Sequence, residues 1–550
     1  MTKRTGGRIL VDQLRIQGCD RIFTVPGESF LAVLDALHDT KEIDTVVCRQ
    51  EGGVAYMADA DGKMTGRPGI AFVTRGPGAT NASGGVHVAF QDSTPMILFV
   101  GDLDRSDRDR EGFQEIDFPA FFAPISKWSA RIDDARRIPE YVARAWRVAT
   151  AGRPGPVVLA IPEDMLRDEV EADDRPPVPP VAECPDPGAL AALFELLKES
   201  AAPLAIVGGA DWSPRAAHHF ANFAVRHGIP VAAAFRRQDS IDNHCAVYAG
   251  QLGYGPNPRL QQRVRDADLV IAVGARLGEA TTDGYKLITP GHPDQTLVHV
   301  HPDPNELGRV YHADLPIVAD MGEFAEMLDE WSDPDLVRFS AGEEAHREWL
   351  EWSEPEPREG VKLDLGPVVK AMRDKLPADT IICNGAGNFS GWWHRYWRYG
   401  SMPTQLAPTS GTMGYGLPAA LAAALRFKDR TVVCVAGDGD FLMNGQELAT
   451  AAQYGADVLV IVVDNSSYGT IRMHQEREYP ARISATGLAN PDFVKLAEAY
   501  GGQGWRVEET AGFDAALDGA ISSRGIRLIH CMCDVEVITN STTISNIRSK

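Results

Sequence analysis

The sequence has few cysteines and no apolar run long enough for a membrane helix. Eight cysteines are scattered through 550 residues, and only Cys531 and Cys533 lie close together. This spacing fits neither a zinc knuckle nor a disulfide framework. The longest apolar runs, such as residues 458–463, fall far short of the roughly 20 residues that a membrane span requires, and residues 1–14 contain no apolar segment of a secretory signal. These absences predict a cytoplasmic protein with reduced cysteines and no membrane partner.

Clusters of positive charge are also absent. The chain contains 54 Lys and Arg residues against 76 Asp and Glu residues, which gives a formal net charge of −22 at pH 7. Nucleic-acid binding requires a positive surface that displaces counterions from phosphates, so no nucleic-acid partner is expected. A hydrophobic content of 44% and a charged content of 24% are those of a soluble globular protein.

Two segments rich in proline and acidic residues separate the chain into three parts. Residues 169–187 and 353–360 interrupt the hydrophobic periodicity and carry little that can be buried. The parts between them have the usual size of domains. The sequence predicts an N-terminal domain over residues 1–170, a central domain over 188–330, a C-terminal domain over 361–535 and a tail over 536–550.

Each part alternates short apolar, β-branched runs with helical patterns such as residues 53–64. Runs of this kind between helices indicate parallel strands that are buried on both faces. The sequence therefore predicts an α/β protein with three successive doubly wound parallel-sheet domains. The expected strands cover residues 21–25, 45–49, 70–74, 96–101, 204–207, 269–273, 297–301, 380–384, 431–436, 458–464 and 528–531.

Two neighbouring strand ends in the last part carry glycines and oxygen ligands. The run 432–436 ends in Gly437-Asp438-Gly439, and the run 458–463, one helix later, leads to Asn465. Ligands collect at the carboxyl ends of parallel strands, and glycines there let the backbone approach a phosphate. A carboxylate, an amide oxygen and a backbone carbonyl suit Mg²⁺, which keeps phosphate oxygens as further ligands. A lone Gly-Asp-Gly also occurs in ordinary strand-to-helix turns, but the paired strands and Asn465 make the combination more specific.

The Gly437-Asp438-Gly439 motif followed by Asn465 resembles the diphosphate–magnesium motif of enzymes that use thiamine diphosphate (ThDP, also called thiamine pyrophosphate). The resemblance extends from about residue 8 to residue 535 in matching order, and it is weakest in the middle domain. It implies a ThDP- and Mg²⁺-dependent enzyme with a pyrimidine-binding, a central and a diphosphate-binding domain. Four further segments resemble the acetolactate synthases of this family, namely residues 76–81, 113–115, 126–128 and 411–420.

The resemblance assigns roles to residues around the cofactor. Asp438 and Asn465 are expected to bind Mg²⁺ through their side chains, and Ser467 through its carbonyl. Met413, which would otherwise be core filler, is expected beneath the bent cofactor, where the Gly411 carbonyl accepts from the 4′-amino group. The Gln and His that acetolactate synthases often carry at positions 388–390 are missing. The other expected cofactor contacts are Gly76, Asn81, Asn388, Phe389, Ser390, Gly437, Gly439, Asp440, Phe441, Tyr468 and Gly469.

Glu51 is the residue most strongly expected to act in catalysis. It stands where a strand leads into a helix, a position at which the helix dipole alone often explains an acid. In the family, a Glu here hydrogen-bonds N1′ of the pyrimidine and favours the tautomer that removes the C2 proton. The family also places this domain of one subunit against the last domain of another. Glu51 and Asp438 would then belong to different chains, so a homodimer or homotetramer with active sites between subunits is expected.

The first part lacks the two adjacent histidines with which pyruvate-decarboxylase-like members protonate the enamine. Its corresponding loop reads Gly112-Phe113-Gln114-Glu115. This difference favours decarboxylation of a 2-keto acid to an enamine that then adds to a second carbonyl. Gln114 is expected to donate to a substrate oxyanion, and Phe113 to contact the substrate. Lys127 either attracts a substrate carboxylate or is a solvated surface charge.

Two positions depart from the acetolactate synthases. Residues 274–276 keep the Gly-Ala-Arg that begins the flavin-contacting stretch, but the Phe-Asp-Asp that follows it is missing, which argues against bound FAD. Arg276 remains a candidate for binding the carboxylate of a second substrate. His474 replaces a Trp that selects the second keto acid, and it either contacts the substrate or is an ordinary packed or solvated residue.

Three functions follow from this resemblance. The leading one is a carboligase or lyase of the acetolactate synthase type that acts on a 2-keto acid. A 2-hydroxyacyl-CoA lyase or an oxalyl-CoA decarboxylase has related chemistry, but it needs a nucleotide pocket in the central domain, where no basic cluster demands one. A non-catalytic ThDP-binding protein is the third, and the presence of Glu51, Asp438 and Asn465 counts against it.

Overall fold

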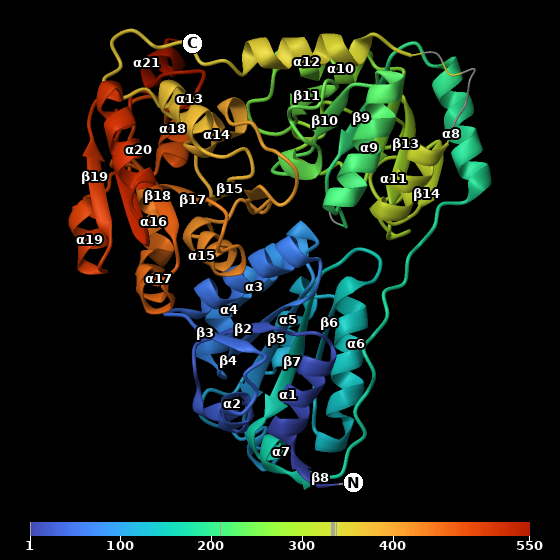
Figure 1. The fold of residues 1–550 in the computed structure, drawn as a ribbon, viewed down its shortest axis with the longest axis vertical. Coiled ribbons are helices and arrows are strands. Elements are labelled where there is room, and N and C mark those ends of the chain that lie inside the picture. Colours follow the sequence, from blue (N-terminus) through green and yellow to red (C-terminus); the bar gives the residue numbers. More distant parts are fainter. Residues whose placement is uncertain (1, 210, 332–335, 337, 550) are drawn as a thin grey trace. The chain divides into compact units, whose positions relative to one another are not determined.

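The computed structural model describes residues 2–549 except 210, 332–335 and 337. The chain forms two compact units (Figure 1). The first unit contains Met1–Val181, Leu417–Phe427 and Asn444–Ala456, and the second contains Ala182–Gly416, Lys428–Met443 and Asp457–Lys550. The segments Leu417–Phe427 and Asn444–Ala456, which follow strands of the C-terminal sheet, are thus part of the first unit.

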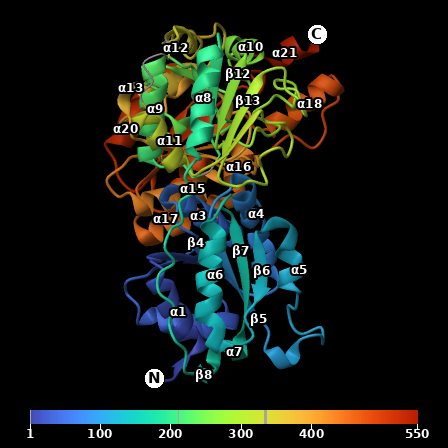
Figure 2. The same cartoon turned by 90° about the vertical axis from the view of Figure 1, so that its right-hand side faces the viewer.

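The first unit is built around a six-stranded parallel sheet with the strand order β3-β2-β4-β5-β7-β6. Its inner strands are buried on both faces, because helices cover both sides (Figure 2). The strands are β2 (Arg21–Thr24), β3 (Asp44–Val47), β4 (Gly69–Val73), β5 (Met96–Asp102), β6 (Trp128–Arg131) and β7 (Pro156–Pro162). The main helices are α1 (Gly6–Ile16), α2 (Leu31–His38), α3 (Glu51–Thr65), α4 (Pro77–Asp92) and α6 (Ile138–Thr150).

The segment that follows this sheet is attached to α1. A short antiparallel pair joins β1 (Arg4–Thr5) to β8 (Glu169–Val170), at the start of the first predicted linker. Residues 171–186 contain no helix or strand. Gln13 and Gln17 exchange side-chain hydrogen bonds with the backbone of residues 175–178, so the start of the linker lies along the first unit.

The second unit contains two parallel six-stranded sheets. The central sheet has the order β11-β10-β9-β12-β13-β14, and it is covered by α8 (Pro187–Glu199), α9 (Pro214–His227) and α11 (Met321–Glu330) on one face. Its strands are β9 (Pro203–Val207), β10 (Val231–Ala233), β11 (Tyr248–Gln251), β12 (Leu269–Val273), β13 (Thr296–His301) and β14 (Leu315–Val318). Two further helices are α10 (Pro258–Asp266) and α12 (Ala341–Trp352).

The C-terminal sheet has the order β16-β15-β17-β18-β20-β19. Numbered within each sheet, the N-terminal and C-terminal sheets share one strand order, which the central sheet does not have. The strands are β15 (Ile381–Asn384), β16 (Gln405–Leu406), β17 (Val432–Gly437), β18 (Val458–Asp464), β19 (Gln503–Val507) and β20 (Ile526–Met532). The helices include α13 (Leu365–Lys375), α14 (Ser390–Tyr396), α15 (Gly416–Arg426), α16 (Asp438–Asn444), α17 (Leu448–Tyr454), α18 (Gly469–Glu478), α19 (Phe493–Ala499), α20 (Phe513–Ile521) and α21 (Ile544–Arg548).

The predicted fold class is confirmed, since each domain has a parallel sheet of six strands between helices. In the C-terminal sheet, β16 lies on one side of β15 and β17 on the other. The connection that leaves β15 therefore runs to one side of the sheet and the connection that leaves β17 runs to the other. The carboxyl ends of two such strands form a natural ligand site. No helix among the described residues is both long and apolar enough to cross a membrane.

Candidate functional site

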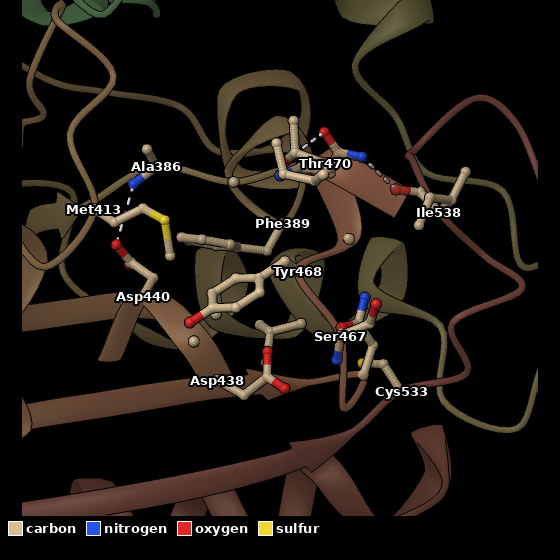
Figure 3. Close-up of a pocket in the computed structure, with 18 of the residues that line it drawn as sticks. Ala386, Phe389, Met413, Asp438, Asp440, Ser467, Tyr468, Thr470, Cys533 and Ile538 are labelled. Atoms are coloured by element: carbon tan, nitrogen blue, oxygen red, sulfur yellow. Dashed lines mark hydrogen bonds between the residues drawn. The ribbon is translucent and has the colours of Figure 1, made fainter. Parts of the chain in front are cut away.

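A cavity of about 240 Å³ opens at the carboxyl ends of β15, β17 and β18 (Figure 3). It lies where the strand order predicts a ligand site. Most of the expected diphosphate and metal residues of the C-terminal domain line it. They are Asn388, Phe389, Gly411, Met413, Gly437, Asp438, Gly439, Asp440, Asn465, Ser467, Tyr468 and Gly469.

The expected metal ligands lie on two adjacent strand ends. β17 ends at Gly437 and leads to Asp438, and its neighbour β18 leads to Asn465 and Ser467. The Asn465 Oδ1 atom accepts from the Ser467 amide at 3.1 Å, and the Ser467 hydroxyl donates to the Thr486 carbonyl at 3.0 Å. The described residues contain no group of three or more His, Cys, Asp or Glu side chains suited to a metal ion. Of the three expected ligands only Asp438 is a carboxylate, so a cation here would also need oxygens from a ligand.

Asp438 belongs to a hydrogen-bonded group with Asn490, Asp464 and His530, none of which has a role predicted from the sequence. Asn490 donates to both Asp438 Oδ2 at 2.7 Å and Asp464 Oδ1 at 2.8 Å. His530 Nε2 lies 2.9 Å from Asp464 Oδ2. Burial raises the pKa of Asp438, and the nearby Asp464 charge adds to this effect. Burial also opposes ionisation of Asp464, but hydrogen bonds from His530, Ser466 and Asn490 hold its pKa below the usual range.

The glycines of the motif let neighbouring side chains pack close to the backbone of the cavity. A Cβ atom at Gly437 would lie 3.0 Å from the Phe389 ring, and one at Gly439 would lie 2.6 Å from the Tyr468 ring. A side chain at Gly469 would meet the Asn465 amide at 2.9 Å. These positions require glycine because two aromatic rings and Asn465 already occupy the space around the motif.

The Asp440 side chain, on α16, connects that helix to two loops around the cavity. Its Oδ1 atom accepts from the Gly414 amide at 2.7 Å and from the Ala386 amide at 3.2 Å (Figure 3). Burial raises the pKa of Asp440 to about 7, although both amide donors oppose the shift. The resemblance gave Asp440 only as a main-chain contact of the cofactor. The two hydrogen bonds that its side chain accepts are therefore an addition to the predicted site.

The loop 411–414 faces the cavity. Gly411 has a φ of 70°, a conformation that favours glycine. Met413 is partly exposed and lines the cavity, so it is not core filler. Asn388 bonds Thr470 on α18 and donates to the Ile538 carbonyl at 3.0 Å, which ties the C-terminal segment to the cavity rim (Figure 3).

Two expected cofactor residues of this domain lie outside the cavity. Phe441 is 2% exposed and packs edge-on against Phe493, with ring centres 5.6 Å apart. Ser390 donates to the Gly387 carbonyl and lines a second, neighbouring cavity, together with His474. The expected contact of the Phe441 main chain and that of Ser390 with the diphosphate stay predictions.

The first unit brings the other predicted residues into two groups. Glu51 begins α3, and its Oε2 atom accepts from the Asn81 side chain of α4 at 2.9 Å. Gly76, with a φ of 59°, lies so close to Gln114 that a Cβ atom would be 2.6 Å from the Gln114 Cβ. The neighbouring Phe113 is 71% exposed. The family motifs at 51, 76–81 and 113–114 are thus neighbours in space.

A buried carboxylate holds the backbone that precedes Glu51. Glu447 is fully buried and accepts from the amides of Arg49 and Gln50 at 3.0 and 3.1 Å, and from the Thr450 hydroxyl at 2.6 Å. All of these residues belong to the first unit. Burial raises the pKa of Glu447, although these hydrogen bonds act to lower it. Nothing in the sequence singles out Glu447, since it lies inside a helical stretch.

Two tentative substrate residues have other contacts. The Lys127 ammonium donates to the Ala151 carbonyl at 2.6 Å, and its chain packs over Gly155. Arg276 forms an ion pair with Glu306 at 3.4 Å and lines neither cavity. Adjacent histidines do occur in the chain, at His218 and His219, but they lie on α9 of the central domain, where His219 binds Asp329.

The fold and the cavity together define the class of protein. It has three parallel α/β domains, and a glycine-lined, oxygen-rich cavity lies at the carboxyl ends of the C-terminal strands. Family models of thiamine pyrophosphate enzymes match all three domains: the N-terminal TPP-binding domain over residues 4–121, the central domain over 190–328 and the C-terminal TPP-binding domain over 385–531. The chain belongs to the thiamine pyrophosphate enzyme family.

Curated relatives agree with this assignment. The acetolactate synthase large subunit of Parasynechococcus marenigrum (strain WH8102) is 34% identical over 540 residues, which cover 94% of this chain and 86% of that protein. An acetolactate synthase of Arthrospira platensis is 31% identical, with 95% and 93% covered. The acetolactate synthase isozyme 2 large subunit of Escherichia coli (strain K12) is 29% identical, with 96% and 95% covered.

Proposed function

We propose that this protein is a ThDP- and Mg²⁺-dependent carboligase of the acetolactate synthase type that acts on a 2-keto acid. The observation that carries the proposal is the pairing of Asp438 and Asn465 on adjacent strand ends beside a glycine-lined cavity. The relatives named above are acetolactate synthases, and the match covers 86 to 95% of their length. Glu51, placed beside Asn81 on α4, supplies the second half of the site.

The cavity residues fit the diphosphate and its cation. Asp438, Asn465 and the Ser467 carbonyl would hold Mg²⁺, and these three oxygens leave coordination positions for diphosphate oxygens. Gly437 and Gly439 line the cavity, so their backbone would lie close to the diphosphate. A bound cation would also reverse the raised pKa of Asp438, because a nearby positive charge favours the carboxylate.

The cofactor supplies the electron sink that makes cleavage and formation of a bond beside a carbonyl possible. The chain's own residues orient it and handle protons. Glu51 would exchange a proton at N1′ of the pyrimidine, and Met413 would support the cofactor from the cavity wall. Gln114 would donate to the substrate oxygen that becomes negative, since an amide donor stabilises developing charge.

The assembly and the flavin are also part of the proposal. We take the active unit to be a homodimer or a homotetramer, in which Glu51 of one subunit completes the cavity of another. The loss of Phe-Asp-Asp after Arg276, together with the Arg276–Glu306 ion pair, favours an enzyme without FAD. The purified protein should accordingly have no flavin absorption bands.

The test is a substrate panel in the presence of ThDP and Mg²⁺. Release of CO₂ from 2-keto acids is followed together with the coupled product, with and without an added acceptor carbonyl. A coupled product that requires both cofactors supports the proposal. Release of CO₂ with an aldehyde as the sole product in the presence of every acceptor would contradict the carboligase assignment.

A further inference from the structure

The second cavity lies beside the first one in the same compact unit. It has a volume of about 620 Å³, and it shares five wall residues with the first cavity, so the two are adjacent. The shared residues are Ala386, Gly387, Asn388, Gly411 and Thr470. A molecule that reacts at a cofactor in the first cavity has room for its remaining atoms here.

One face of α18 forms a wall of this cavity. Thr470, Met473, His474 and Arg477 are spaced at i, i+3, i+4 and i+7, and all four line the cavity. Arg472 and Glu476 are directed elsewhere, since they bond each other and Glu476 also pairs with Arg548. The helix therefore keeps its structural ion pairs away from the cavity and presents an imidazole and a guanidinium to it.

The other cation of the wall, Arg236, follows β10 in the central domain. It is 4% exposed, donates to the Pro408 carbonyl and has a φ of 58°, which is unusual for a residue with a side chain. Backbone strain of this kind persists where the surroundings enforce it, and it gathers at functional sites. The described wall residues include two arginines and two histidines, but no Asp or Glu.

A buried ring nitrogen in the wall of this cavity also lacks a hydrogen-bond partner. His394 on α14 lines the cavity and is 5% exposed, and its Nε2 atom has no hydrogen-bond partner among the described residues. Burial and the neighbouring Arg236 charge lower the pKa of His394 to about 3, so the ring is neutral and has one N–H to donate. Buried polar atoms without a partner are uncommon in proteins, and this one is available to a ligand in the cavity.

We infer that the second cavity binds the anionic end of the carbonyl substrate, a carboxylate or a phosphate separated by several atoms from the reacting carbon. The inference rests on the proposed function for the reaction itself. Arg236 would hold the anion at depth, and Arg477 would attract it at the rim, because a charge-assisted contact is strongest where water is excluded. The favoured substrates are therefore dicarboxylic oxo compounds or phosphorylated aldehydes, rather than small neutral aldehydes.

Binding of unreactive probes tests the inference without the reaction. Calorimetry would measure succinate, inorganic phosphate and the neutral succinamide against the protein, with and without ThDP and Mg²⁺. Succinate or phosphate should bind, and succinamide should not. The anion that binds more tightly shows whether the anionic end of the substrate is a carboxylate or a phosphate. Arg477→Gln should weaken anion binding about tenfold, as expected for one lost charged contact.

The control is Arg482→Gln, since Arg482 is exposed and lies outside the cavity wall. It should leave anion binding unchanged. The inference is overturned if neither anion binds, if succinamide binds equally well, or if Arg477→Gln binds as tightly as the wild type. Arg236→Lys, which keeps the charge, should bind anions more weakly than the wild type but still better than succinamide.

A kinetic comparison separates this inference from the proposed function. Arg477→Gln should lower kcat/KM about tenfold for succinic semialdehyde as acceptor and leave that for butanal unchanged. If no acceptor gives a coupled product while succinate still binds through Arg477, the proposed function fails and the anion site stands. If both acceptors react equally well in the wild type, the anion site fails and the carboligase assignment stands.

Discussion

Glu51 begins α3, where its carboxylate accepts from Asn81 and Gln50 caps the helix amides. The helix therefore does not need Glu51 as a cap. We predict that Glu51→Gln folds normally and still binds ThDP, but turns over on the order of 10²-fold more slowly, the scale of a lost acid–base group. An amide cannot exchange the proton at N1′ that the carboxylate exchanges.

The direct measurement is the exchange of the C2 hydrogen of bound ThDP in deuterated water. Glu195→Gln, which removes an exposed carboxylate paired with Lys198 on α8, should exchange as fast as the wild type. Equal exchange rates in Glu51→Gln and the wild type would show that Glu51 does not activate the cofactor.

We predict that Asp438 contributes to cofactor binding rather than to stability. Its pKa is raised by burial in the cofactor-free protein, so ionisation at neutral pH costs stability, and this cost grows as the pH rises through the folded-state pKa. Asp438→Ala should therefore abolish Mg²⁺-dependent ThDP binding in calorimetry while leaving the cofactor-free protein at least as stable near neutral pH. Asp518→Ala, at an exposed site on α20, is the control. ThDP affinity unchanged in Asp438→Ala would remove the site assignment.

Motif residues could be predicted from the sequence, whereas the residues that support them could not. Asp438 and Asn465 follow apolar runs at strand ends, so their proximity follows from the topology of parallel sheets. Asn490 comes from a loop, and its contact with Asp438 depends on tertiary folding alone. The ion pair of Arg276 with Glu306 was not predicted either, since both residues follow the adjacent strands β12 and β13 but no motif pointed to Glu306.

At the scale of elements, α17 and the turn before it matter because Glu447 holds the strand end that leads to Glu51. We predict that Glu447→Ala lowers the free energy of unfolding by about 1–3 kcal/mol, since two buried amides and a hydroxyl lose their acceptor. It should also slow C2–H exchange by disturbing Glu51. Glu447→Gln keeps an oxygen for both amides, so it should lose much less stability in denaturant unfolding. Equal losses in the two variants would contradict this role.

The predicted strands agree with the structure to within one or two residues, because inner strands of parallel sheets are continuous apolar runs. Several edge strands were not predicted. β6 is half-buried throughout and β19 has only one buried residue, so neither has such a run. The fully buried β7 was also missed, although its sequence has the same character as the strands that were predicted.

At the scale of the whole molecule, the family and the three-domain architecture followed from motif order along the chain. The strand order did not, because an apolar run specifies that a strand is buried but not which strand lies beside it. The N-terminal and C-terminal sheets share one order and the central sheet has another, which agrees with two cofactor-binding domains that flank a domain of a different kind.

The last prediction concerns the assembly. If Glu51 of one subunit completes the cavity of another, a protein with Glu51→Gln in one subunit and Asp438→Ala in its neighbour contains one intact site. Co-expression of the two inactive variants with different tags should therefore restore activity, and statistical mixing of dimers gives about a quarter of the wild-type value. Hybrids purified by both tags should reach about half. Each variant alone, and a mixture of the two homodimers that has not exchanged subunits, should remain inactive. Hybrids without activity would show that both residues act within one chain, because every chain of the hybrid then carries a defect.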